Sequence, residues 1–332
     1  MGSSTFSLTV LAIVASVAAA QDIPAPEDTG EVLTGPQKVE GQVVRPGDRA
    51  MVPVPGVWVI LHRVGSDQAA PLDSVRADSQ GRYSFNFRRT GDERAVYFVS
   101  ASFGGVAYFT PPLMHSTVRG EEAEIAVFDT TSSHVPISVR GHHVIVSAVD
   151  AGQMRTVTEV YEIANDSSVT RVAGSGPNGQ VWSVAFPAQA SRFEVSQGDV
   201  PAEAVRFESG RARVFAPLAP GIKQLAFSYS LPARAFPLRI PVAEATQILE
   251  VLIEEEKGSV TGAKLKETAP VALERRSFRR FLADDVPADA VSVINLPGAA
   301  RGGGVDPRFM FAVTAVIGGA MAIALARALR QR

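Results

Sequence analysis

The residues of this chain best suited to chemistry are two adjacent histidines, His142 and His143. Imidazole nitrogens bind copper or zinc well, and either side chain could act together with His134 or His115. The surrounding run is typical of a β-strand, in which neighbouring side chains point to opposite faces, so the adjacent pair cannot chelate one metal from one side. We therefore expect half-buried or surface histidines and no metal site, with His134, His142 and His143 as the candidate ligands.

Paired carboxylates are the next candidates, because general acid–base chemistry often uses two of them. Adjacent acids occur at 121–122, 254–256 and 284–285, in hydrophilic stretches where such charge is usually solvated. Gly174-Ser175-Gly176 lies in a loop and is not a Gly-x-Ser-x-Gly elbow. The chain contains no cysteine, which excludes a thiol nucleophile and thiolate metal sites. We expect no catalytic residues, no enzymatic activity and no cofactor; a hydrolase with an unrecognised site is the least favoured alternative.

Arginines gather around one aromatic residue near the C-terminal end of the chain. Arg275, Arg276, Arg279 and Arg280 flank Phe278, and in an extended strand Arg276, Phe278 and Arg280 share one face. One explanation is an edge strand kept soluble by its charge. The functional alternative is contact with an anionic partner through Arg276, Phe278 and Arg280, such as lipid headgroups, an envelope polysaccharide or an acidic protein.

The elements that must position these residues are predicted to be β-strands. Residues 57–61 form a continuous β-branched and aromatic run, and Gly81 follows a polar turn in which glycine adopts a positive φ easily. Tyr83, Phe85 and Phe87 then alternate with polar residues, which places the three aromatic rings on one face. We expect these rings in a hydrophobic core, in preference to a ligand-stacking platform.

Residues 38–112 resemble a known family of small β-domains. The pattern Pro55-Gly56-Val57-x-Val59-x-Leu61, followed by Asp78-x-x-Gly81-x-Tyr83-x-Phe85, is similar to the carboxypeptidase regulatory-like domain of the transthyretin-like β-sandwich type. The resemblance covers about a quarter of the chain. It implies a non-catalytic module, since the family accompanies enzymes, receptors and adhesins. The zinc-peptidase that accompanies this family binds its metal through a His-x-x-Glu pair, and none of the five histidines in this chain begins such a pair.

The rest of the chain predicts further short strands separated by turns. Residues 113–236 have the spacing of an Ig-like β-sandwich. Residues 237–298 add more strands, and the sequence leaves open whether they complete that sandwich or form a third domain. The stretch 246–255 also fits a helical face, but its strand neighbours favour a strand.

Both ends of the chain carry apolar segments. Residues 8–20 end in Ala18-Ala19-Ala20, which is typical of a secretory signal peptide over 1–20, although no basic residue precedes them. A linker over 21–37 leads to the domains, and a Gly-rich tether covers 299–308. Phe309–Leu329 is predicted to be a transmembrane helix, with residues 330–332 as a cytoplasmic tail. Small residues four apart within this span permit a homodimer.

These segments place residues 21–308 outside the cytoplasm. The net charge of −2 gives no basic field for nucleic acid, and we expect none as a partner. The predicted partners are the lipid bilayer and an unknown envelope protein or polysaccharide. The chain is thus interpreted as an all-β, membrane-anchored binding or scaffolding module of the cell envelope; the alternative is an accessory or assembly subunit of a membrane complex that handles a metal or cofactor outside the cytoplasm.

Overall fold

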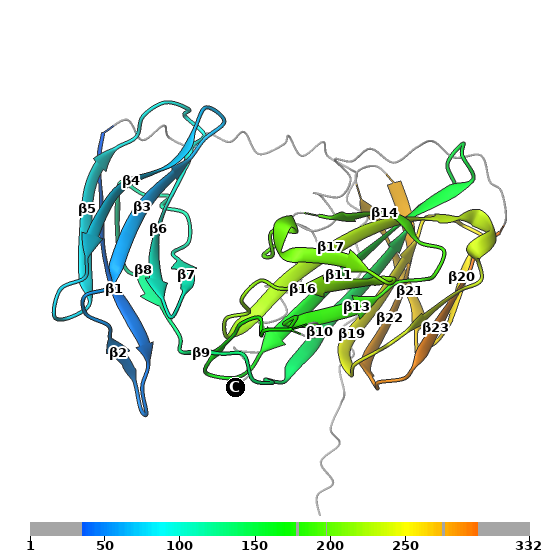
Figure 1. The fold of residues 1–332 in the computed structure, drawn as a ribbon. Helices are drawn as coiled ribbons and strands as arrows, with labels where there is room; N and C mark the ends of the chain where they lie inside the picture. The colour runs from blue at the N-terminus through cyan, green and yellow to red at the C-terminus, as the bar shows by residue number, and fades with distance from the viewer. Residues whose placement is uncertain (1–34, 177–178, 197, 274–275, 298–332) are drawn as a thin grey trace, which may run out of the picture.

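The computed structural model describes residues 35–176, 179–196, 198–273 and 276–297, and these form two units built from β-strands (Figure 1). The predicted all-β class is confirmed. The predicted signal peptide, tether and transmembrane segment lie outside the described residues. Among those that are described, no helix has the length and apolar character needed to cross a membrane.

The first unit consists of two four-stranded sheets packed face to face. Residues from both sheets meet in one hydrophobic cluster, so the unit has the two layers of a β-sandwich. As predicted, Tyr83 and Phe85 are buried there and Phe87 packs against the cluster. One sheet contains β2 (Met51–Pro53), β1 (Pro36–Pro46), β5 (Arg82–Arg88) and β8 (Thr117–Ala126); the other contains β4 (Ala69–Arg76), β3 (Trp58–Val64), β6 (Val96–Phe103) and β7 (Val106–Phe109).

Strand β8 extends the first unit beyond residue 112, where the sequence analysis ends it. It pairs in parallel with β1, and its residues Val118 and Ile125 join the core of the first unit. In this pairing Glu40 lies opposite Arg119 and Gln42 lies opposite Glu124, so the four residues 120–123 of β8 bulge out of the ladder. The bulge interrupts the alternation of apolar and polar residues by which a strand is recognised in a sequence. Since the partner strand β1 also lies far away in the sequence, β8 was not assigned to the first unit.

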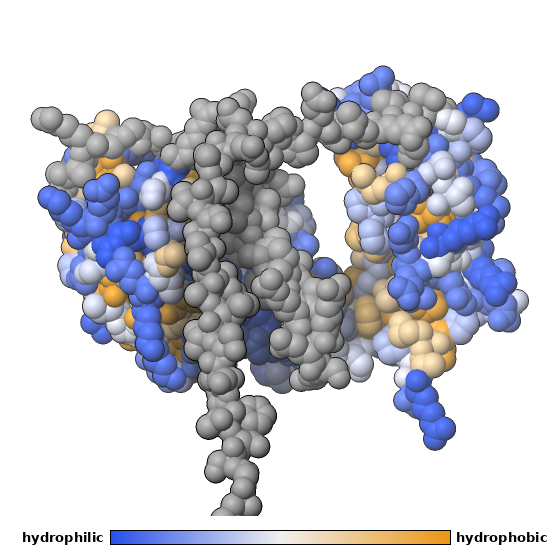
Figure 2. Space-filling model, turned by 180° about the vertical axis from the view of Figure 1, so that it is seen from behind, coloured by the Kyte–Doolittle hydropathy of each residue, from blue (hydrophilic) through white to orange (hydrophobic). Residues whose placement is uncertain are grey.

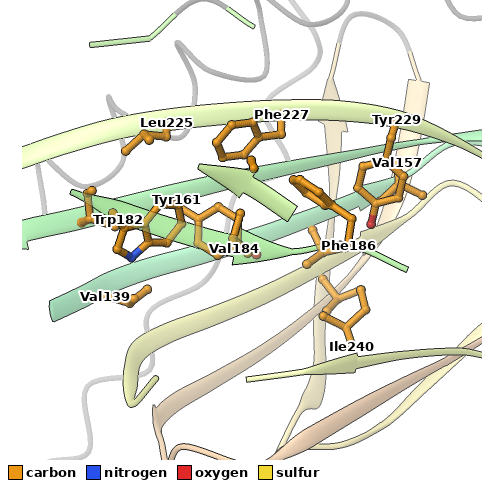
Figure 3. Close-up of a cluster of buried hydrophobic side chains, with 14 of the residues drawn as sticks. Val139, Val157, Tyr161, Trp182, Val184, Phe186, Leu225, Phe227, Tyr229 and Ile240 are labelled. Carbon is orange, nitrogen blue, oxygen red and sulfur yellow. The ribbon is translucent and has the colours of Figure 1, made fainter. Parts of the chain in front are cut away.

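The second unit is organised around a seven-stranded sheet in which only β10 and β19 run parallel. Two three-stranded sheets cover one face of it and share its largest hydrophobic cluster (Figure 3). In spatial order the large sheet contains β14 (Ser191–Val195), β17 (Gly221–Pro232), β11 (Met154–Asn165), β10 (Ile137–Val146), β19 (Thr246–Ile253), β22 (Arg276–Val286) and β21 (Lys266–Leu273). The covering sheets are β13 (Trp182–Ala185), β16 (Arg211–Val214) and β15 (Val205–Glu208), and β18 (Leu238–Pro241), β23 (Val291–Asn295) and β20 (Ser259–Gly262).

The strands after residue 237 belong to this second unit. Because β19 lies between β10 and β22, the region that the sequence leaves unassigned shares a sheet with earlier strands. Residues 246–253 form a strand, as favoured over a helix. The expectation that the arginine-rich segment is an edge strand is wrong, since β22 is paired on one side with β19 and on the other with β21. Strands β21 and β23 were not predicted.

A small joint connects the two units. Strand β9 (Thr130–Thr131) pairs in parallel with β12 (Thr170–Arg171) just after β8 and β11 respectively. The Tyr108 hydroxyl lies 2.8 Å from Oγ1 of Thr170 and donates to the carbonyl of Phe128 at 3.0 Å. One core tyrosine of the first unit thus contacts a strand of the second.

Candidate functional site

His142 lies on the covered face of the large sheet, next to an ionisable partner. Its Nε2 is 2.8 Å from Oε2 of Glu159, and its ring stacks on Tyr161 with 4.2 Å between centroids. Glu159 also accepts hydrogen bonds from the hydroxyls of Tyr161 (2.5 Å) and Tyr229 (2.6 Å). Burial alone would raise the pKa of Glu159, but these partners lower it below its ordinary value. Both carboxylate oxygens are therefore engaged, as in a structural polar network.

His143 points to the opposite face of the same strand, as neighbouring positions of a strand require. Its Nδ1 lies 2.7 Å from Oε2 of Glu250 on β19. Arg280 on β22 donates through Nε to the other oxygen of Glu250 at 2.5 Å. Burial would raise the pKa of Glu250, and His143 and Arg280 together lower it. The two histidines thus belong to two separate networks on opposite faces of the large sheet.

A further pair of polar atoms lies beside His143. Nε2 of His143 and Oε2 of Glu162 are both buried, and neither has a hydrogen-bond partner within the described chain. Both atoms approach the space left by Gly141, where a β-carbon would lie 2.9 Å and 2.8 Å from them. Sequence reasoning missed Glu162, because its relation to His143 depends on the pairing of β10 with β11.

The other metal candidates do not join this pair. His134 is exposed in the segment between β9 and β10, and His115 is exposed in the segment before β8. Within the part of the chain that the structure describes, no three or more His, Asp or Glu side chains are arranged to hold a metal ion.

The arginine cluster is largely occupied by acidic partners. Arg276 forms a two-pronged ion pair with Glu254, including a 2.7 Å contact from Nε to Oε1. Phe278 is fully buried in a hydrophobic cluster, while Arg280 is paired with Glu250. The three residues predicted to contact an anionic partner therefore include one core side chain and two ion-paired ones.

The adjacent acids lie in separate places and form no common site. Glu255 pairs with the buried Arg155 at 3.0 Å, and Glu254 pairs with Arg276. Glu121 and Glu122 are exposed in the looped-out part of β8.

The outer face of the sheet β4-β3-β6-β7 presents a row of aromatic rings. His62 stacks on Phe98 with 5.0 Å between centroids, and Phe98 meets Phe109 edge-on at 5.8 Å. Phe109 is 57% exposed and Trp58 is 50% exposed. Val59 and Leu61 are buried, so the alternating Trp58 and His62 must lie on the outer face. We call this surface, comprising Trp58, Ile60, His62, Val64, Val96, Phe98 and Phe109, the aromatic face.

Polar groups surround the aromatic face at fixed positions. Nε2 of His62 lies 2.8 Å from Oγ of Ser100, and partial burial lowers the pKa of this histidine. The guanidinium of Arg76 lies over the Trp58 ring at 4.9 Å. Such an arrangement offers flat apolar contact area together with hydrogen-bonding groups at its edge. The first unit also shows hydrophobic residues among hydrophilic ones when it is seen from behind (Figure 2).

No protein-family model matches the chain, and no curated protein matches it significantly.

Proposed function

We propose that this chain is a non-catalytic binding module of the cell envelope, and that the aromatic face is its contact surface. Contiguous exposed apolar side chains are unusual on a soluble domain and mark interaction sites more often than chance. The supporting observation is the continuous row of His62, Phe98 and Phe109 across three strands, with Trp58 exposed on the same face.

The proposed partner is an envelope polysaccharide. The faces of sugar rings present C–H groups that pack well on exposed aromatic rings, while their hydroxyls bond to polar groups at the edge. Arg76 supplies such a group beside Trp58. A protein partner with an apolar patch is the competing outcome of the experiment below.

The proposal includes the position of the module in the cell. A signal peptide over 1–20 and a transmembrane helix over 309–329 would hold residues 21–308 outside the cytoplasm, with the C-terminus inside. In this proposal the first unit is a carboxypeptidase regulatory-like sandwich and the second unit is an Ig-like sandwich. The tether over 299–308 would let both units reach away from the bilayer.

Sedimentation of the full chain with insoluble polysaccharides tests the contact surface. The probes are peptidoglycan and chitin, and the variant combines Trp58→Ala with Phe109→Ala. Because both side chains are at least half exposed, we expect the variant to fold and to bind at least about tenfold more weakly. Ile222→Ala, which removes an exposed apolar residue of the second unit, is the control. Equal sedimentation of wild type and double variant would contradict the proposal.

A second candidate function is an accessory subunit that handles a metal ion. The observation in its favour is the convergence of His143 Nε2 and Glu162 Oε2, with Glu250 holding the other imidazole nitrogen as a carboxylate does in many metal sites. Titration of the full chain with Zn(II) or Cu(II) should then show one site that is lost in Gly141→Ala, where the added β-carbon fills the space. His134→Ala is the control; binding that follows His134 would refute this function.

A further inference from the structure

The second layer of the second unit is divided, and a cavity lies in the division. Strand β13 is the outer strand of one covering sheet, and β18 is the outer strand of the other. Between them lies a cavity of about 140 Å³ whose floor is the large sheet at His142, Glu159 and Tyr161. Figure 3 shows the side chains of Trp182, Val184 and Ile240 over this sheet.

The interior of this cavity is mostly apolar. Val139, Val184, Phe186 and Ile240 contribute buried hydrophobic walls. The polar floor is already satisfied, because Glu159 accepts bonds from His142 and two tyrosine hydroxyls. A ligand therefore gains little from the floor beyond packing and must find its polar partners elsewhere.

Those partners are present on β18 and on the segment that follows it. Arg239 and Glu244 both line the cavity and are exposed to solvent. No ion pair joins either of them to another residue of the described chain, nor are they paired with each other. Partial burial raises the pKa of Glu244, and a polar contact with the Trp182 indole N–H partly offsets this effect.

One buried donor in the cavity wall lies beside Glu244 without completing a well-aligned hydrogen bond. Trp182 is 7% exposed, and its Nε1 completes no hydrogen bond within the described chain. Buried indole N–H groups usually find a partner, since an unsatisfied donor costs free energy. The cavity thus combines a cation that has no ion-pair partner in the described chain with a carboxyl group that lies beside a buried indole N–H, around an apolar interior.

We propose that this cavity binds a small zwitterion, namely a free α-amino acid with a short apolar side chain. Its ammonium group would bind Glu244, which lies beside the Trp182 N–H, its carboxylate would bind Arg239, and its side chain would enter the apolar interior. A cavity of about 140 Å³ holds several water molecules, which is the space of a valine-sized ligand and not of a nucleotide or oligosaccharide. The site is independent of the aromatic face and goes beyond the proposed function.

Tryptophan fluorescence provides a direct test. The chain has two tryptophans, so Trp58→Phe in the full chain leaves Trp182 as the sole reporter. We expect L-valine to change its fluorescence saturably. Isobutylamine, which lacks the carboxylate, and 3-methylbutanoate, which lacks the ammonium group, should each bind at least about tenfold more weakly.

Matched variants connect the signal to the proposed contacts. Glu244→Gln and Arg239→Gln, introduced beside Trp58→Phe, should each weaken L-valine binding by about tenfold or more. Both side chains are exposed, so neither change should affect folding, which circular dichroism checks. Glu203→Gln, at an exposed position in the short helix Ala202–Ala204, is the control. No saturable change with L-valine, equal binding of the two half-ligands, or unchanged binding by Glu244→Gln would each overturn the proposal.

Discussion

At the scale of single residues, the second unit stabilises two buried glutamates, Glu159 and Glu250, by giving each of them several hydrogen-bond donors. Glu159 receives three contacts and Glu250 receives two, and in both residues these contacts lower the pKa against the effect of burial. Glu162 is the contrasting case, because one of its oxygens lacks a partner and burial raises its pKa. The two kinds of glutamate should respond to pH in opposite directions.

Glu159→Gln is expected to destabilise the protein at neutral pH by about 3 kcal/mol, because it removes one partner of a buried network. The lowered pKa of Glu159 stabilises the fold above the ordinary carboxyl pKa of 4.5, and this contribution is lost as the pH falls through the lowered value. Denaturant unfolding at pH 7 and in the acid range should therefore show the gap between wild type and variant closing on acidification. Glu194→Gln, at an exposed position, is the control; a gap that is independent of pH would contradict this account.

Glu162→Gln should have the opposite pH signature. Because the folded-state pKa is raised, the folded protein binds the proton more tightly than the unfolded chain, and stability falls as the pH rises through that pKa. The glutamine variant removes this term, so its free energy of unfolding should rise relative to that of wild type as the pH increases above the ordinary carboxyl pKa of 4.5. Glu159→Gln, measured over the same pH range, serves as the matched comparison. If the free energies of unfolding of Glu162→Gln and wild type changed with pH in parallel, the raised pKa of Glu162 would be refuted.

At the scale of strands, local alternation is what the sequence reveals. The pattern around Tyr83 and Phe85 predicts a core-facing strand, and the adjacent histidines predict opposite faces of one strand. Partners that depend on distant pairing were not predictable. Glu250 meets His143 only because β19 pairs in parallel with β10, and Glu254 meets Arg276 only because β22 pairs with β19. The charge cluster therefore looked free in the sequence although the fold neutralises it.

Gly41 shows how one residue can fix the pairing of two strands. A β-carbon there would lie 1.9 Å from the carbonyl oxygen of Ala123 and 2.5 Å from the Tyr83 hydroxyl, which itself donates to that carbonyl at 2.6 Å. Gly41→Ala should force β8 away from β1 and lower the free energy of unfolding by about 1–3 kcal/mol. Gly35→Ala, where no atom lies within 4 Å of the added carbon, is the control. Chemical denaturation measures both, and equal stabilities would show that β8 is not held at this point.

At the scale of the whole molecule, the two units are connected in a way that links their cores. Tyr108 belongs to the core of the first unit and bonds to Thr170 beyond β11, while Val172 and Ala219 of the second unit pack against the first core. A contact surface on the first unit and a ligand cavity in the second are therefore carried by one connected body, and both would be positioned by whatever holds its C-terminal end.

The last prediction concerns the proposed transmembrane helix over 309–329. Arg155 donates to the carbonyl of Pro297, so the described fold ends against the second unit about a dozen residues before the uncharged run at 309–326. A chain truncated after residue 308 keeps every described strand and should remain folded. We expect the full chain to fractionate with membranes and resist extraction at alkaline pH, and the truncated chain to appear in the soluble extracytoplasmic fraction. Protease added outside intact cells should then digest the body of the full chain. Protection of that body would contradict its exposure outside the cell. Membrane association of the truncated chain would show that a segment other than 309–329 is the anchor.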